Sequence, residues 1–124
     1  MGQGKGNAMA ITLLLCLSLL QSHMAQAAVY FVGGSKGWTF NVAPWTKGKR
    51  FRAGDVLVFN YSKMAHNVVA LNNKVGYNWC QKTKGSKVYQ TGRDRIKLVK
   101  GYNFFFCGFP GHCKAGLKIA IYAF

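Results

Sequence analysis

Short runs rich in β-branched and aromatic residues, separated by glycine and other turn-forming residues, limit what this chain can fold into. The pattern is β throughout, and the expected helix is a single short turn near Tyr77–Lys82. The runs that predict strands are Val29–Val32, Val56–Tyr61, Asn67–Leu71, Val88–Thr91, Arg95–Val99, Asn103–Cys107 and Leu117–Phe124. Seven short strands with this punctuation indicate an all-β antiparallel sandwich, in which two sheets bury their inner faces against each other.

The first 27 residues differ from the rest and have the layout of a secretory signal peptide. Lys5 precedes a 13-residue apolar run from Ala8 to Leu20, and Ala25-Gln26-Ala27 supplies a small-x-small cleavage pattern. The run is shorter than the roughly 20 residues that span a bilayer, which disfavours a retained anchor helix. We therefore expect residues 1–27 to be removed, leaving residues 28–124 as one secreted domain without a transmembrane or lipid anchor.

Cleavage changes the cysteine count from even to odd. Removing 27 of 124 residues leaves 97, which contain three cysteines and two histidines: Cys80, Cys107, Cys113, His66 and His112. In an oxidising compartment two cysteines pair, and the third is a reactive thiol, an intermolecular partner or a metal ligand. One thiolate and two imidazoles form the donor set of a blue-copper centre.

The spacing around His112 favours Cys107 as the thiolate. The two residues flank a Gly/Pro turn that can bring sulfur and imidazole to one centre, whereas His66 must come from a distant strand. Cys113 directly follows His112 and in an extended chain points the other way, which favours its pairing with Cys80. A Cys107–Cys113 bridge would close a smaller loop and remove the thiolate. A buried structural cysteine and a zinc site are the remaining alternatives.

Segments 107–113 (Cys-Gly-Phe-Pro-Gly-His-Cys), 54–61 (Gly-Asp-Val-Leu-Val-Phe-Asn-Tyr) and 66–69 (His-Asn-Val-Val) resemble the phytocyanins, the plant extracellular blue copper proteins of the cupredoxin fold. The start Ala28-Val29-Tyr30 is similar to the plantacyanin branch, which includes basic blue and chemocyanin-like proteins, and the resemblance runs from residue 28 to residue 124. It implies a cupredoxin-like Greek-key β-sandwich of about seven to eight strands with one type 1 copper ion. The implied copper ligands and disulfide are His66, Cys107, His112 and Cys80–Cys113.

One position departs from the family pattern. The residue five places after His112 is usually Met in plantacyanins and Gln in stellacyanins, and here it is Leu117, which cannot coordinate. Losing a thioether donor stabilises Cu(II) less than Cu(I), which predicts a higher reduction potential. Met64 is the alternative axial donor, and a further interpretation is that Leu117 marks a relative that has stopped using redox chemistry.

The expected domain is strongly basic. Of the 17 Lys and Arg residues only Lys5 lies in the leader, and both acidic residues, Asp55 and Asp94, remain, so the formal net charge is +14. The positive electrostatic potential of such a charge favours anionic partners. Export argues against nucleic acid and favours acidic cell-wall polysaccharide or an anionic membrane surface. Asn60 begins the glycosylation sequon Asn60-Tyr61-Ser62.

These features predict an electron carrier and not an enzyme. We expect a secreted, monomeric type 1 copper protein that passes one electron to an unidentified partner in the plant apoplast, with Phe109 and Pro110 beside His112 in an apolar docking rim. A site with no open coordination position argues against an oxidase. The alternative implied by the resemblance is a non-redox, wall-associated signalling or guidance protein of reproductive tissue, with structural or vestigial copper.

Overall fold

Seven strands and one short α-helix make up the computed structural model, which describes residues 26–124. Residues 1–25, most of the expected leader, lie outside the described residues. The strands are β1 (Val29–Phe31), β2 (Val56–Asn60), β3 (Val68–Leu71), β4 (Lys87–Tyr89), β5 (Arg93–Lys97), β6 (Gly101–Phe106) and β7 (Lys118–Ala123). Every expected strand is present, and the all-β prediction is confirmed.

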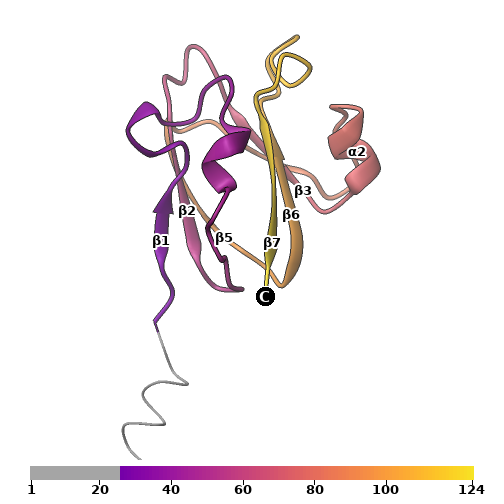
Figure 1. The fold of residues 1–124 in the computed structure, drawn as a ribbon. Helices are drawn as coiled ribbons and strands as arrows, with labels where there is room; N and C mark the ends of the chain where they lie inside the picture. Colours follow the sequence, from indigo (N-terminus) through magenta and orange to yellow (C-terminus); the bar gives the residue numbers. More distant parts are fainter. Residues whose placement is uncertain (1–25) are drawn as a thin grey trace, which may run out of the picture.

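The strands form two facing sheets (Figure 1), one with the order β1-β2-β5 and the other β4-β3-β6-β7. All strand pairs are antiparallel except β1 and β2, which run parallel with Val29 opposite Val56. The expectation of a wholly antiparallel sandwich is therefore wrong at this pair. Residues 32–55, which include the 3₁₀ turns η1 (Gly34–Lys36) and η2 (Ala43–Thr46), carry the chain back to the end of the sheet where β1 began. A parallel pair requires such a long connection.

The helix α2 (Lys74–Asn78) begins earlier than the expected turn at Tyr77–Lys82. Its N-cap is Asn73, whose side-chain oxygen accepts a hydrogen bond from the amide of Gly76 at 3.0 Å. An asparagine in this place satisfies an amide that the first helical turn leaves unpaired, so the helix starts there.

Three consecutive phenylalanines in β6 serve two apolar layers. Phe105 points into the sandwich, where its ring centroid lies 5.1 Å from that of Phe59 on β2. Phe104 and Phe106 point to the outer face, where Tyr77 of α2 packs on Phe104 at 5.0 Å. Burying side chains of this size stabilises the fold by roughly 1.5–3 kcal/mol each. Both faces of β6 are therefore anchored immediately before Cys107.

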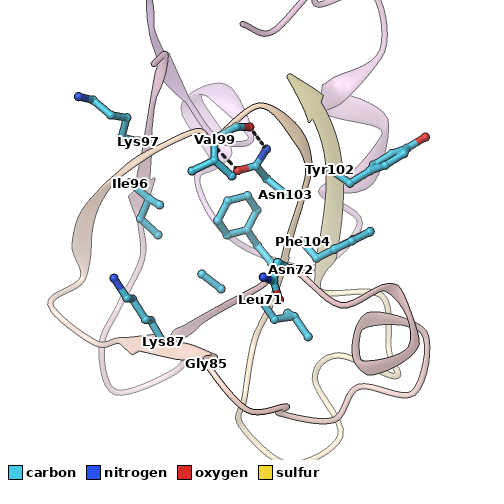
Figure 2. Close-up of a pocket in the computed structure, with 12 residues that line it drawn as sticks. Leu71, Asn72, Gly85, Lys87, Ile96, Lys97, Val99, Tyr102, Asn103 and Phe104 are labelled. Carbon is cyan, nitrogen blue, oxygen red and sulfur yellow. Dashed lines mark hydrogen bonds between the residues drawn. The ribbon is translucent and has the colours of Figure 1, made fainter. Parts of the chain in front are cut away.

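A cavity of about 250 Å³ lies between the sheets beside their edge strands β4 and β5. Figure 2 shows the buried Asn103 at its wall, where the carboxamide bonds the amide and the carbonyl of Val99 at 3.0 and 2.8 Å. Lys87 and Lys97 lie on the same side of the cavity in this view. The cysteine and histidines of the expected metal site do not line it.

Candidate metal centre

Cys107 follows β6 directly and is 1% exposed. Its amide donates to the carbonyl oxygen of Leu117 at 3.0 Å, just before β7 begins. Cys107 is the free cysteine of the described chain. The thiol therefore lies in the sandwich core, on a backbone position that is hydrogen-bonded to the residue preceding β7.

His112 lies in the loop between β6 and β7. Its amide donates to the carbonyl of Phe109 at 3.1 Å, which closes a turn, and its carbonyl accepts from the amide of Leu117 at 3.0 Å. Gly111, the residue before it, has φ 79°, a conformation that glycine adopts without the steric cost of a side chain. These contacts turn the chain back so that the imidazole faces Cys107.

His66 reaches the site from a segment far from Cys107 and His112 in the sequence. It precedes β3, its amide donates to the carbonyl of Ser62 at 3.0 Å, and its side chain is 8% exposed. Because β3 pairs with β6, with Val69 opposite Phe106, the start of β3 lies beside the end of β6. Sheet pairing therefore brings together His66 and Cys107, which are 41 positions apart in the sequence.

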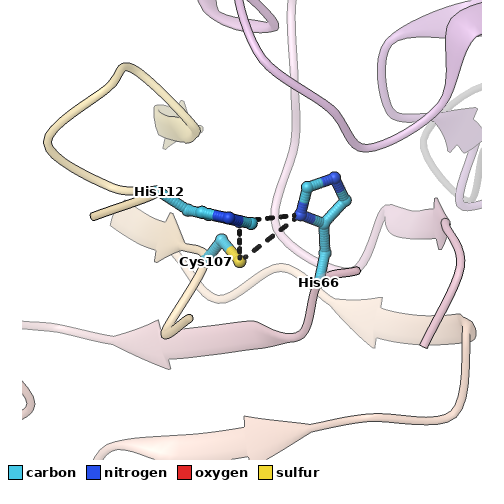
Figure 3. Close-up of side chains that lie close together, drawn as sticks. All are labelled: His66, Cys107 and His112. Atoms are coloured by element: carbon cyan, nitrogen blue, oxygen red, sulfur yellow. Dashed lines mark hydrogen bonds between the residues drawn. The ribbon is translucent and has the colours of Figure 1, made fainter. Parts of the chain in front are cut away.

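Figure 3 shows the three side chains converging. The Nδ1 atoms of His66 and His112 are 3.0 Å apart, and the sulfur of Cys107 lies 3.7 Å from the first and 3.5 Å from the second. The point equidistant from the three atoms is about 2 Å from each. This is close to the lengths of metal–imidazole and metal–thiolate bonds, roughly 2.0 and 2.3 Å for zinc.

The donor set fits a soft or borderline metal ion. Two facing Nδ1 atoms share at most one proton between them, whereas a cation at the centre uses both lone pairs and the sulfur. Burial lowers the pKa of His66 below its ordinary value of 6.5, and the neighbouring His112 lowers it further. The imidazole of His66 is thereby kept in the neutral form that coordinates metals.

Aromatic side chains surround the half-buried imidazole of His112. Phe109 lies 5.7 Å from it between ring centroids, and Pro110 is exposed beside it. Phe40, which the sequence analysis missed, is 39% exposed and lies 5.0 Å from His112 and 5.5 Å from His66. No local motif connects Phe40 with the histidines, because the long connection between β1 and β2 brings it there.

Asn67 is a second residue that the sequence analysis did not assign to the site. Its side-chain oxygen accepts from the amide of Gly108 at 2.6 Å, and its carbonyl accepts from the indole nitrogen of Trp38 at 2.9 Å. It thus connects the strand that follows His66 to the residue that follows Cys107. Its position directly after His66, a candidate ligand, was the one sequence signal that could have assigned it to the site.

Neither candidate axial residue offers a donor toward the centre. Leu117 is fully buried in the core cluster that contains Cys107, and its side chain is a hydrocarbon without a donor atom. Met64 is 85% exposed, which disfavours the alternative in which its thioether replaces the missing donor.

Cys80 and Cys113 form a disulfide, with their Cα atoms 5.8 Å apart. The bridge joins the second residue after α2 to the loop that carries His112, so this loop is covalently held at the residue next to His112. Asn60, the sequon acceptor, is the last residue of β2, and its carbonyl accepts from the amide of Trp38 at 2.8 Å. Within residues 26–124 no helix has the length and apolar character needed to cross a membrane.

A β-sandwich that holds one thiolate and two imidazoles on a single centre defines the mononuclear blue copper proteins of the cupredoxin class. The family model described as a plastocyanin-like domain matches residues 38–117. The chain belongs to this family, in the plantacyanin branch of the phytocyanins.

Individual relatives agree with this assignment. A basic blue protein of Cucumis sativus is 59% identical over 77% of this chain and 99% of its own length. A basic blue protein of Arabidopsis thaliana is 51% identical and a chemocyanin of Lilium longiflorum 45% identical, each over 99% of both chains. The solved structure of cucumber basic protein, a blue copper protein, superposes with a TM-score of 0.74 at 59% identity, over 78% of this chain and all of its own. These findings support one type 1 copper ion and a cupredoxin-type electron carrier.

Proposed function

We propose that this chain is a secreted type 1 copper protein that carries single electrons in the plant extracellular space, with His66, Cys107 and His112 as the copper ligands. The observation that carries the proposal is the convergence of the two Nδ1 atoms and the sulfur around one point. Bound copper would supply the redox change between Cu(II) and Cu(I). The chain itself turns over no substrate.

The protein's part is to hold the donors in one arrangement and to exclude water. Cys107 and His66 are buried, and backbone hydrogen bonds to Leu117 hold the Cys107 and His112 positions at a fixed separation. A rigid donor set changes little between two metal oxidation states, which keeps the structural cost of electron transfer low. His112 is the more exposed imidazole, so its edge is the proposed route for electrons, with Phe40, Phe109 and Pro110 as the apolar rim against which a redox partner docks.

The visible spectrum of the copper-reconstituted protein tests this function. An intense thiolate-to-copper band is expected for residues 28–124, and Cys107→Ser is expected to abolish it. A folded, copper-loaded protein without the band would contradict the proposal. Cys80, already in the disulfide, is the matched control position: a Cys80→Ser/Cys113→Ser double variant is expected to keep the band as long as it folds.

The charge distribution supports an anionic extracellular partner. Within residues 26–124 both acidic side chains, Asp55 and Asp94, are buried, whereas every Lys and Arg of the same residues except the half-buried Lys118 is exposed. The outer surface therefore carries side-chain charge of one sign only, which suits an acidic wall polysaccharide. Retention on polygalacturonate is expected to fall steeply as salt rises from about 0.05 to 0.5 M, because the Debye length shrinks. Retention that does not depend on salt would contradict this partner.

A second candidate function is non-redox signalling at the cell wall. Leu117 in place of a coordinating residue and the similarity to a lily chemocyanin favour it. The two functions differ in their need for the thiolate. Biological activity kept by the Cys107→Ser variant, which cannot form the copper–thiolate bond, would favour signalling, and activity lost with the colour would favour electron transfer.

A further inference from the structure

Asp55 is a buried carboxylate that the copper function does not use. It is 4% exposed and lies immediately before β2. One carboxylate oxygen accepts from the amide of Arg52 and the other from the amide of Ala28, both at 2.9 Å. Within residues 26–124 its side chain is bonded only by backbone amides, and no basic side chain pairs with it. A buried ionised carboxylate is best compensated when it is both hydrogen-bonded and paired with a cation, and Asp55 has the hydrogen bonds without the cation.

The parallel pairing of β1 and β2 places the start of the expected domain beside this carboxylate. Since Val29 lies opposite Val56, the residues that precede them, Ala28 and Asp55, meet at the same end of the sheet. The amide of Val56 donates to the carbonyl of Ala28 at 2.9 Å, which fixes Ala28 from its other side. Gln26, Ala27 and Ala28 are exposed and outside any strand, so the peptide bond between Ala27 and Ala28 is accessible.

We propose that Asp55 is the binding site for the α-ammonium group created when the chain is cut between Ala27 and Ala28. Hydrolysis of that bond adds one water, leaves a carboxylate on Ala27 and converts the Ala28 amide into an amine that is protonated at neutral pH. The nitrogen that already donates to Asp55 at 2.9 Å then carries a positive charge. The hydrogen bond therefore favours one bond: a cut one or two residues earlier places the charge on another nitrogen and leaves the neutral Ala28 amide on Asp55.

Removal of the leader therefore releases the domain and also forms the ion pair that stabilises it. The precursor holds Asp55 by two neutral donors, and the processed domain holds it by one neutral donor and one ion. Hydrogen bonds to ionised groups are stronger than neutral ones. The proposal rests on processing at Ala27–Ala28 and is independent of copper, so its test uses the unfolding equilibrium as readout.

The test compares residues 28–124, prepared with Ala28 as the free first residue, with residues 26–124. Both samples keep the nitrogen that bonds Asp55 and both carry one charged terminus, so the comparison tests whether that charge lies on the nitrogen at Asp55. At about pH 6.5 the shorter chain is expected to have a roughly fivefold larger folding equilibrium constant in urea unfolding. Equal stability of the two chains would overturn the proposal.

Two variants identify the partner of the charge. The advantage of the free Ala28 terminus is expected to vanish in Asp55→Asn and to persist in Asp94→Asn, which alters the other buried acid. An advantage that persists in Asp55→Asn would overturn the proposal. If either variant fails to fold, mass spectrometry of the secreted protein decides: a first residue of Ala28 is expected, and any other overturns it. The copper–thiolate band is read in parallel on both chain lengths, which separates failure of this inference from failure of the copper function.

Discussion

The amide of Cys107 donates to the carbonyl of Leu117 at 3.0 Å, so the proposed thiolate ligand and the residue at the proposed axial position are directly bonded through the backbone. The amide of Leu117 in turn donates to the carbonyl of His112 at 3.0 Å. Residue 117 is thus fixed relative to two of the proposed ligands whatever its side chain is. A substitution there changes the chemistry at the axial position with little change in the backbone.

Leu117→Met is therefore expected to lower the reduction potential of the copper-loaded protein, because a thioether donor stabilises Cu(II) relative to Cu(I). Leucine and methionine are similar in volume, so the fold is expected to tolerate the change within about 1.5 kcal/mol. Voltammetry of both proteins measures the shift. Leu117→Ile, which adds no donor, is the control, and an unchanged or raised potential in the Met variant would refute the axial assignment.

Asn67→Ala is expected to weaken copper binding about 10- to 100-fold, because the amide of Gly108 next to Cys107 loses its acceptor. Competition with a copper chelator measures the affinity. Asn78→Ala, an exposed asparagine in α2, is the matched control and is expected to leave the affinity unchanged. Equal affinities in the two variants would show that Asn67 does not position the loop.

Replacing both Cys80 and Cys113 by alanine is expected to reduce the free energy of unfolding by about 2–5 kcal/mol, since the bridge constrains the unfolded chain. Urea unfolding of the apoprotein measures this loss without contribution from the metal. A loss of less than about 1 kcal/mol would mean that the loop carrying His112 is held mainly by its backbone hydrogen bonds.

Tyr61→Phe is expected to destabilise the domain by about 1–3 kcal/mol. The Tyr61 hydroxyl donates to the buried carboxylate of Asp94, which also accepts from Thr91. Burial and then the hydrogen bond to Asp94 raise the pKa of Tyr61 above its ordinary value of 10.0. Tyr102→Phe, on an exposed tyrosine, is the control. Similar losses in both variants would refute a specific role for the Tyr61–Asp94 bond.

The apoprotein is expected to lose stability as the pH falls below about 6.5. The pKa of His66 is lowered in the folded state, so the unfolded chain takes up the proton first and is favoured in acid. The loss begins at the unfolded value and ends once the pH has passed the lower folded value. Its slope from this residue is at most about 1.4 kcal/mol per pH unit. Urea midpoints at several pH values measure it, and His66→Gln is expected to flatten the slope; a slope that persists unchanged would assign it elsewhere.

The strands were predictable because each is a short β-branched or aromatic run between turn residues, and two flanking residues at most were misplaced at any end. The parallel pairing of β1 and β2 was not predictable by this route, because runs such as Val29–Phe31 and Val56–Asn60 contain no local signal of direction. The same long connection explains why Phe40 was missed beside His112. Spacing can identify donors such as Cys107 that share a loop with His112, but only tertiary structure identifies what packs over them.

The burial of Asp55 and Asp94 has a consequence for how attachment to a polyanion is released. With no carboxylate side chain on the outside of the described domain, mild acidification leaves the cations of the surface as they are. If the proposed acidic wall polysaccharide is the partner, any loosening in acid must come from protonation of its carboxyl groups, because the basic side chains of the protein surface keep their charge as the pH falls. A cell that acidifies its wall would then weaken the attachment through the polysaccharide and not through the protein.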